Sequence, residues 1–255
     1  MIRFLQRSIK AIAARWGVVM FKRSTGLYLP EEDMPRVVYR LCGKTNPLIV
    51  DGGAHQGDFV RAIRRVSPSA RFICFEPTPA LVSDLNIMFS DDANVTVVPI
   101  ALGDSEGTAR FHLNSAPSTN SLLASADQTT GELSALINTQ EMVDVEVATM
   151  DAALARLNQT DVDIIKFDLQ GHDYRALLGS KQTLKRTAVV VVEVWFAPVY
   201  EGAGDYLQVC SLMDDKGFAL YSLTSLHYGN NDRLLWGDAI FVPRNSPAWR
   251  ALINN

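Results

Sequence analysis

From Leu48 onward, short apolar runs alternate with segments whose apolar residues recur at helical spacing. The apolar runs are Leu48–Val50, Arg71–Phe75 and Val95–Ile100, and the periodic segments between them are Asp58–Val66 and Pro79–Phe89. Proline opens the second periodic segment, as is common in the first turn of a helix. This strand–helix order predicts an α/β fold with a doubly wound, mostly parallel sheet that is covered by helices on both faces.

The alternation is interrupted between Gly103 and Ala148. Thr108–Leu113 and Val143–Ala148 alternate apolar and polar residues like exposed strands, and the stretch between them is rich in Ser, Thr and Asn. We interpret the segment as an inserted β-hairpin with a long, mobile connection. A linker between two domains is disfavoured, because the strand–helix alternation resumes immediately afterwards.

The second half of the chain continues the alternation. The expected helices are Met150–Leu157, Tyr174–Lys185 and Tyr206–Lys216, and the expected strands are Asp163–Phe167, Ala188–Val194, Phe218–Leu223 and Asp238–Val242. We expect the last strand to pair antiparallel at or near an edge of the sheet.

Residues 1–30 differ from the rest and are expected to form a basic N-terminal extension to a 31–255 domain. Residues 2–16 place Ile2, Leu5, Ile9, Ile12 and Trp16 on one helical face, with bases elsewhere. The bases interrupt every apolar stretch, so a signal peptide is disfavoured. We favour an amphipathic helix that packs on its own domain or a partner chain; the alternative is that residues 1–22 attach to an anionic membrane or self-associate. "YLPEED" is interpreted as a loop, and Met34–Cys42 as a short helix.

The composition is that of a globular protein: of 255 residues, 47% are hydrophobic and 20% charged. No stretch reaches the roughly 18 consecutive apolar residues that a spanning helix needs. Cys42, Cys74 and Cys210 are odd in number and widely spaced, which argues against a disulfide framework or a zinc site. A cytoplasmic location is therefore expected.

The net charge of −4 conceals an asymmetry. Residues 1–30 carry six Lys or Arg and no acid, which leaves 18 bases against 28 acids in the rest of the chain. Because contacts with phosphate need basic surface, we expect no nucleic-acid partner.

The stretch "DGGAHQG", Asp51–Gly57, stands between the first strand and the first helix, where an open α/β sheet binds its ligand. A phosphate-binding loop is excluded, because Asp58 occupies the position of the required lysine. A dinucleotide site is disfavoured, because the glycine spacing is wrong and Asp51 would repel the pyrophosphate.

S-adenosylmethionine fits these charges better, since it carries a sulfonium and an ammonium but no phosphate. Asp51 can face the ammonium, directly or through water, and Gly52 and Gly53 let the backbone approach the ligand closely. The following helix N-terminus favours the ligand's carboxylate. Glu76, at the end of the second strand, can accept hydrogen bonds from both ribose hydroxyls.

Six motifs stand in order between about Leu48 and Val242: "VDGGAHQGDF", "FEPTPALVSDL", "IALGDSEGTARFHL", "VATMDAAL", "IIKFDLQGHDYRALLGS" and "VVVVEVW". Together they resemble the FkbM-type family of S-adenosylmethionine-dependent methyltransferases. His55 stands where that family often has asparagine, and Asp173 where its "DxxGxE" run usually has glutamate. Residues 1–30 lie outside the resemblance.

The resemblance implies a Rossmann-like class I methyltransferase domain over residues 31–255. It implies cofactor contacts at Asp51, Gly53, Ala54, His55, Gly57 and Glu76, at Ala101 and Leu102 beside the adenine, and at Asp168 at the methyl-transfer end. Independently of the resemblance, Asp104 follows a strand end and can bond the adenine amine, although a turn aspartate explains it equally well.

Methyl transfer requires that acceptor, methyl group and sulfur be aligned and that the acceptor proton be removed. Asp168 and Glu193 lie at the ends of neighbouring predicted strands, and His172 follows Asp168 closely. We predict that all three are catalytic, with His172 acting on the acceptor proton and Asp168 orienting the reacting groups. The alternatives are an exposed first-turn histidine and a buried structural glutamate. Their spacing demands no metal ion, so we assign none.

Three aromatic residues near these acids have ordinary interpretations. Trp195 and Phe196 are interpreted as packing residues rather than a substrate platform, and His227 as a surface histidine.

We therefore expect an S-adenosylmethionine-dependent methyltransferase, cytoplasmic or peripheral at the membrane, that acts on a hydroxyl of a sugar, glycan or secondary metabolite. The preference for a hydroxyl follows from the resemblance alone. One alternative is a non-catalytic S-adenosylmethionine-binding or scaffold protein. A second, an NAD-dependent oxidoreductase, is disfavoured by Asp51 and the glycine spacing.

Overall fold

The computed structural model describes residues 30–127, 129, 131–229 and 232–253. Its internal contacts divide the chain into two units, Met1–Asp33 and Met34–Asn255. The amphipathic helix expected in residues 2–16 lies outside the described residues. Within the described ranges, no helix is both long and apolar enough to cross a membrane.

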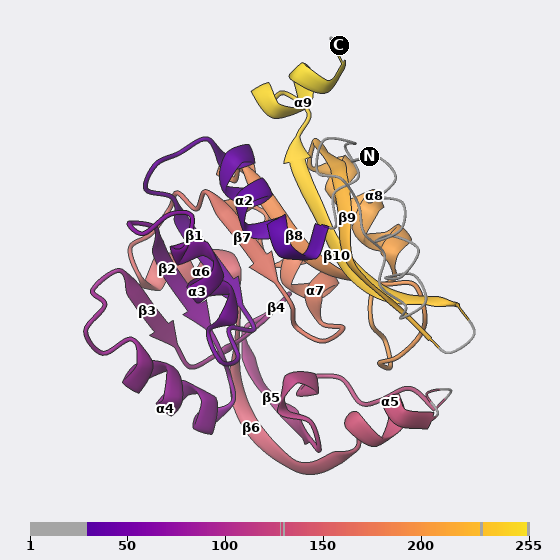
Figure 1. The fold of residues 1–255 in the computed structure, drawn as a ribbon. Helices are drawn as coiled ribbons and strands as arrows, with labels where there is room; N and C mark the ends of the chain where they lie inside the picture. The colour runs from indigo at the N-terminus through magenta and orange to yellow at the C-terminus, as the bar shows by residue number, and fades with distance from the viewer. Residues whose placement is uncertain (1–29, 128, 130, 230–231, 254–255) are drawn as a thin grey trace, which may run out of the picture. The chain divides into compact units, whose positions relative to one another are not determined.

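A seven-stranded sheet organises the second unit (Figure 1). Five adjacent strands run parallel, in the order β3 (Val95–Val98), β2 (Arg71–Phe75), β1 (Leu48–Gly52), β7 (Ile164–Phe167) and β8 (Val189–Trp195). Next to β8 lies β10 (Leu234–Pro243), which pairs antiparallel with β8 and with the edge strand β9 (Phe218–Tyr228). The predicted doubly wound, mostly parallel sheet is confirmed, and its topological switch falls between β1 and β7.

Helices cover both faces of this sheet. One face packs against α2 (Pro30–Cys42), α3 (Asp58–Arg64), α4 (Pro79–Met88) and α9 (Pro247–Ile253), and the other against α6 (Met150–Arg156), α7 (Asp173–Leu178) and α8 (Tyr206–Asp215). Alternate strand residues enter the two cores: Val50 joins the core with α6–α8, and Ile49 joins the opposite one. Every residue of β1 and β8 is buried, as expected for strands between two helical layers.

The insert forms a separate three-stranded sheet, and the predicted hairpin is confirmed. β5 (Gly107–Asn114) and β6 (Thr139–Thr149) pair antiparallel, and β4 (Ala101–Gly103) adds parallel to β6. Figure 1 shows β5 and β6 as a long pair of strands apart from the main sheet. Their connection contains η2 (Pro117–Thr119) and α5 (Gly131–Leu136), and it hydrogen-bonds to residues 199–201 after β8. The connection is therefore docked against the loop after β8.

The helix expected over Tyr174–Lys185 is wrong in its length, because it breaks into α7 and a short 3-10 helix, η3 (Thr183–Arg186). Gly179 ends α7 against β4: a Cβ on Gly179 would stand 2.1 Å from the carbonyl oxygen of Gly103. Asp151 then accepts hydrogen bonds from the amides that begin η3, at 2.8 and 2.9 Å. A contact with a distant strand therefore sets the break.

Two further boundaries differ from the prediction. The loop expected at "YLPEED" is wrong from its third residue onward, because α2 begins at Pro30. The last two strands are longer than expected, since β9 runs to Tyr228 and β10 begins at Leu234. Their register shifts three times, and such irregularities disrupt the simple alternation that marks a strand in sequence.

Candidate active site

A pocket opens at the carboxyl ends of β1, β2 and β7 and at the start of β4, beside the topological switch. It encloses about 670 Å³, with open solvent at its mouth included. The predicted site residues that line it are Gly53, His55, Glu76, Ala101, Leu102, Asp168 and His172. The insert adds Phe111, Pro117, Ser118, Asn120 and Leu122 to the wall. The structure thus gathers side chains from both halves of the chain around one space.

The loop after β1 owes its shape to glycines with positive φ. Gly53 has φ +75°, and a Cβ there would stand 2.0 Å from the carbonyl oxygen of Asp168. Only glycine therefore lets the loops after β1 and β7 approach this closely. The amides of Gly53 and Ala54 both donate to the carbonyl of Phe75, at 2.9 and 3.1 Å, which joins the ends of β1 and β2.

Three predicted loop residues lie outside the pocket lining and shape the loop instead. A Cβ on Gly52 would stand 2.7 Å from the ring of Phe167, so that glycine allows close packing under the loop. Ala54 is buried in the core beside α3. Gly57, with φ +73°, is the N-cap of α3.

Glu76 directly follows β2 and is only 4% exposed. Its Oε2 accepts a hydrogen bond from the amide of His55 and its Oε1 accepts one from the amide of Thr78, both at 2.9 Å. Each carboxylate oxygen has a second lone pair, so both retain capacity for a ligand hydroxyl. Beside it, Nε2 of His55 is buried and has no hydrogen-bond partner in the described part of the chain.

The start of β4 brings Ala101 and Leu102 into the pocket wall. Asp104, which we considered for the adenine amine, is exposed and does not line the pocket. Its carboxylate pairs with the guanidinium of Arg175 at 2.9 Å. This geometry favours a structural role at the surface for Asp104.

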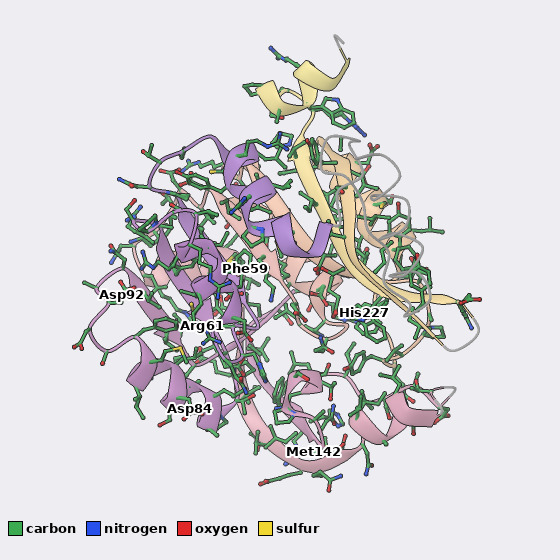
Figure 2. All side chains as sticks on the ribbon, viewed as in Figure 1. Phe59, Arg61, Asp84, Asp92, Met142 and His227 are labelled. Carbon is green, nitrogen blue, oxygen red and sulfur yellow. The ribbon has the colours of Figure 1, made fainter. Side chains whose placement is uncertain are left out.

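A buried ionic row runs from β1 to the loop after β7. The ammonium of Lys166 lies 3.6 Å from Oδ1 of Asp51 and 3.3 Å from Oδ2 of Asp168. Its other neighbour is Phe59 of α3, labelled in Figure 2, whose ring centroid is 6.0 Å away. Asp51 is fully buried behind the pocket wall, whereas 38% of the Asp168 side chain is exposed. Only the Asp168 end of the row therefore meets the pocket.

Burial governs the charges of this row. It raises the pKa of Asp51 to about 6, although Lys166 acts in the opposite direction. For Lys166 burial lowers the pKa, but Asp168 and Asp51 outweigh it, and the net shift is upward. Lys166 is therefore a stable cation between two carboxyl groups.

Glu193, on β8, joins this cluster through Gln170. Nε2 of Gln170 donates to Oδ1 of Asp168 at 2.7 Å and to Oε2 of Glu193 at 3.2 Å. Glu193 is 6% exposed and does not line the pocket. Burial, followed by the charge of Asp168, raises the pKa of Glu193 well above its usual range. The structure thus brings Asp168 and Glu193 together, as predicted, with the amide of Gln170 between them.

His172 lines the same pocket but lies on the β4 side. A Cβ on Gly103 would stand 3.3 Å from its Nε2, and its Nδ1 is buried without a partner among the described residues. Burial lowers the pKa of His172 to about 4; Arg175 acts in the same direction and Asp104 against it. The imidazole is therefore neutral at neutral pH, and its catalytic role stays a prediction.

Asp173 stabilises the loop between Asp168 and α7. Its carboxylate accepts hydrogen bonds from the amides of Leu169 and Gly171, at 3.0 and 3.2 Å. Burial, followed by Asp168, raises the pKa of Asp173 to about 7. Over the described ranges, His, Cys, Asp and Glu side chains form no group of three that could hold a metal ion.

The aromatic residues near the acids are packing residues, as predicted for Trp195 and Phe196. Trp195 is 4% exposed and packs edge-on against Tyr200, with ring centroids 5.2 Å apart. Phe196 stacks on Tyr206 at 4.8 Å. His227, labelled in Figure 2, is exposed on β9 and stacks on Trp236 at 4.7 Å.

Sequence reasoning missed Lys166 and Tyr200 as members of the site, and it gave Gln170 no role of its own. One signal for Lys166 was present, because a lysine within the apolar strand "IIKF" must find a buried counter-charge. Nothing local marked Tyr200, since its hydroxyl reaches Oε1 of Gln170 only through the fold.

Comparison with known proteins identifies a family. The Methyltransferase FkbM domain matches residues 51–220, which include the loop after β1, Glu76, Asp168 and Glu193. The chain belongs to the FkbM methyltransferase family.

Two relatives are similar over most of their length. The 2-O-methyltransferase NoeI of Sinorhizobium fredii is 25% identical over 172 residues, which cover 66% of this chain and 71% of NoeI. Methyltransferase sdnD of Sordaria araneosa is 26% identical over 197 residues, 68% of this chain and 74% of sdnD. Among solved structures, an rRNA methylase from Streptococcus thermophilus superposes with a TM-score of 0.49 and 10% identity, covering 88% of this chain and 99% of that one.

Proposed function

We propose that this protein is an S-adenosylmethionine-dependent O-methyltransferase that acts on a hydroxyl of a sugar, a glycan or a secondary metabolite. The observation that carries the proposal is the arrangement of two carboxylates in one pocket: Glu76 is fixed by backbone amides, and Asp168 is paired with Lys166. Transfer to oxygen is supported by membership of the family and by the name of the relative NoeI.

The pocket residues fit this cofactor. Glu76 keeps lone pairs that can accept from ribose hydroxyls, and Gly53 lines the pocket where the loops after β1 and β7 approach each other. Ile100, Leu102 and Phe111 give an apolar wall that suits a flat adenine ring. When bound, the cofactor supplies a methyl group on a positively charged sulfur.

Asp168 is the residue to which we assign the acceptor proton. It is the part of the ionic row that meets the pocket, and it forms an ion pair with Lys166 at 3.3 Å. Asp168 would accept the hydroxyl proton while the hydroxyl oxygen gains the methyl group. Glu193 is a weaker candidate because it is buried and does not line the pocket, and His172 because it lies at the β4 side of the pocket, next to Gly103.

Calorimetric titration with S-adenosylhomocysteine and with NAD, followed by transfer of a radiolabelled methyl group to a panel of sugars, glycan fragments and phenols, tests the proposal. We expect saturable binding of S-adenosylhomocysteine, none of NAD, and label on the oxygen of at least one acceptor. Binding of NAD alone would overturn the cofactor assignment. Binding of S-adenosylhomocysteine without transfer to any acceptor would favour the scaffold alternative.

A further inference from the structure

Gln170, in the loop after β7, makes contacts that neither the strand-end argument nor the family resemblance assigned. We propose that Gln170, oriented by Tyr200, is a positioning residue that joins Asp168 and Glu193 in one hydrogen-bonded frame and so sets which carboxyl group receives the acceptor proton. The reaction in this inference rests on the proposed function, whereas the frame consists of contacts within the chain.

Both the nitrogen and the oxygen of the Gln170 side-chain amide form hydrogen bonds. Its two N–H groups face Oδ1 of Asp168 at 2.7 Å and Oε2 of Glu193 at 3.2 Å, and its Oε1 accepts from the hydroxyl of Tyr200 at 2.9 Å. In the reversed orientation, the amide oxygen would face two carboxyl oxygens. The hydrogen-bond pattern therefore admits one orientation of the amide.

The backbone of Gln170 is held in an unfavourable conformation, with φ +51°. Two contacts hold it there: the hydroxyl of Ser121, in the insert, donates to its carbonyl oxygen at 2.7 Å, and Asp173 binds the amides on both sides of it. A non-glycine residue keeps such a conformation only where its surroundings over-determine it. Here the conformation directs the side chain to the two acids.

Tyr200 links this frame to the insert. Its hydroxyl is also 3.1 Å from the carbonyl oxygen of Thr119, and a hydroxyl has one hydrogen to share between that oxygen and Gln170. Tyr200 itself is 3% exposed and fixed against Trp195. The insert, which lines the pocket, and the carboxyl pair therefore contact the same hydroxyl.

The frame also suits the local electrostatics. The charged and titratable groups that act on the pair are Lys166 on β7, Asp51 on β1, Asp173 on α7, Asp238 on β10 and Tyr200 after β8. Burial raises the pKa of Glu193 strongly in these surroundings. A neutral amide gives both acids a donor without adding charge, whereas a glutamate at position 170 would add a further carboxyl group to an acidic cluster.

The test compares Gln170→Met, Gln170→Glu and Tyr200→Phe, with Tyr228→Phe on the exposed end of β9 as the matched control. At saturating cofactor, Gln170→Met should lower turnover about ten- to a hundredfold, because hydrogen bonds to charged groups contribute roughly 1.5–3 kcal/mol. Gln170→Glu should lower it at least as much. Tyr200→Phe should lower turnover about two- to tenfold, because it removes a hydrogen bond between neutral groups. In each of the three variants the acidic limb of the rate profile should move to higher pH, with affinity for S-adenosylhomocysteine within about threefold.

Carbon-13 NMR titration of the Asp and Glu carboxyl groups provides a readout that needs no turnover. In Gln170→Met, the resonances that disappear in Asp168→Asn and in Glu193→Gln should titrate at altered pH, and they should be unchanged in Tyr228→Phe. If Gln170→Met shows the altered titrations but the wild-type protein transfers no methyl group, the hydrogen-bonded frame stands and the proposed function is rejected. Unaltered titrations, or a loss of turnover that only follows a loss of thermal stability, would reduce Gln170 to a structural residue and overturn the inference.

Discussion

Glu76 and Glu193 are both buried glutamates at the carboxyl-terminal side of the main sheet, and they are 4% and 6% exposed. Two backbone amides hold Glu76, from His55 and Thr78. Glu193 receives one hydrogen bond, from the side chain of Gln170, and lies among other acids. The two glutamates are thus similarly buried but differ in their partners: backbone amides surround one carboxyl group, and a side-chain amide and other acids surround the other.

The difference separates the two ends of the site. Backbone amides neither titrate nor change rotamer, so they hold both oxygens of Glu76 in fixed positions toward the pocket. Around Glu193 the carboxyl groups outnumber the ammonium of Lys166, and burial raises the pKa of Glu193 well above its usual range. In the proposed function, backbone amides fix the carboxylate at the cofactor end, whereas at the transfer end several carboxyl groups share the single cation of Lys166. Substitutions at the two ends should therefore fail in different ways.

The largest effect is expected for Asp168→Asn, which removes the proposed proton acceptor at the transfer end. Turnover at saturating cofactor should fall roughly 10²–10⁴-fold, the usual contribution of a general base. Affinity for S-adenosylhomocysteine should stay within about threefold. Single-turnover assays and calorimetry measure the two quantities.

Asp161→Asn is the matched control, since Asp161 is exposed and pairs with Arg186 away from the pocket. A loss of less than threefold in Asp168→Asn would remove Asp168 from the chemistry and return attention to His172.

Lys166→Met should destabilise the fold by about 3–5 kcal/mol near pH 8, because it leaves the buried Asp51 without its cation. The cost should shrink at acidic pH, where Asp51, with a pKa raised to about 6 even beside Lys166, is protonated and needs no partner. Urea unfolding at pH 8 and pH 5 measures both values.

The double variant Lys166→Met with Asp51→Asn should recover much of the loss at pH 8, because neither charge is then buried alone. Lys185→Met, at an exposed lysine of η3, should change the free energy of unfolding by less than about 1 kcal/mol. An equal cost for Lys166→Met at both pH values would show that the side chain contributes packing and not charge.

Glu76→Ala should weaken S-adenosylhomocysteine binding about tenfold to a hundredfold, since a charge-assisted hydrogen bond contributes roughly 1.5–3 kcal/mol. Turnover at saturating cofactor should change little, because the transfer end is intact. The variant also leaves two amides without their acceptor, so calorimetry is done well below its unfolding temperature.

Glu106→Ala, at an exposed glutamate that pairs with Arg156, is the control for Glu76→Ala. Unchanged affinity in Glu76→Ala would place the ribose elsewhere in the pocket.

Much of the fold followed from local patterns. Arg71–Phe75 is reproduced to the residue, because a buried parallel strand is a continuous apolar run with clear ends. β4 was missed because three residues are too few to show a period, and the break before η3 because it depends on the contact between Gly179 and Gly103. Patterns along the chain carry no information on such contacts between distant segments.

The site was predictable where strand ends alone define it. Parallel strands end at one edge of a sheet, which predicted that Asp51, Glu76, Asp168 and Glu193 lie near one another; Glu76 and Asp168 line the pocket, and Asp51 and Glu193 lie behind it. The different surroundings of these four carboxyl groups were not predictable, since the partners of Asp51 depend on the register of β1 against β7. The role of Gln170 depends further on how the insert docks, which no local pattern describes.

The smallest effect is expected for Glu193→Gln, which sharpens the comparison with Glu76. A protonated glutamic acid and glutamine have nearly the same shape and charge, so turnover at neutral pH should stay within about threefold of wild type, since the variant removes no charge. The pKa of Glu193 is raised from its ordinary 4.5, so the wild-type protein gains stability from this carboxyl group at low pH and loses it as pH rises. Glutamine does not titrate, and the stability of Glu193→Gln relative to wild type should therefore increase with pH above about 4.5. Urea unfolding between pH 4 and pH 9 gives this difference, and the rate profile gives turnover. A loss of a hundredfold in turnover, or a relative stability that falls with pH, would mean that Glu193 is ionised and makes Glu193 the better candidate for the base.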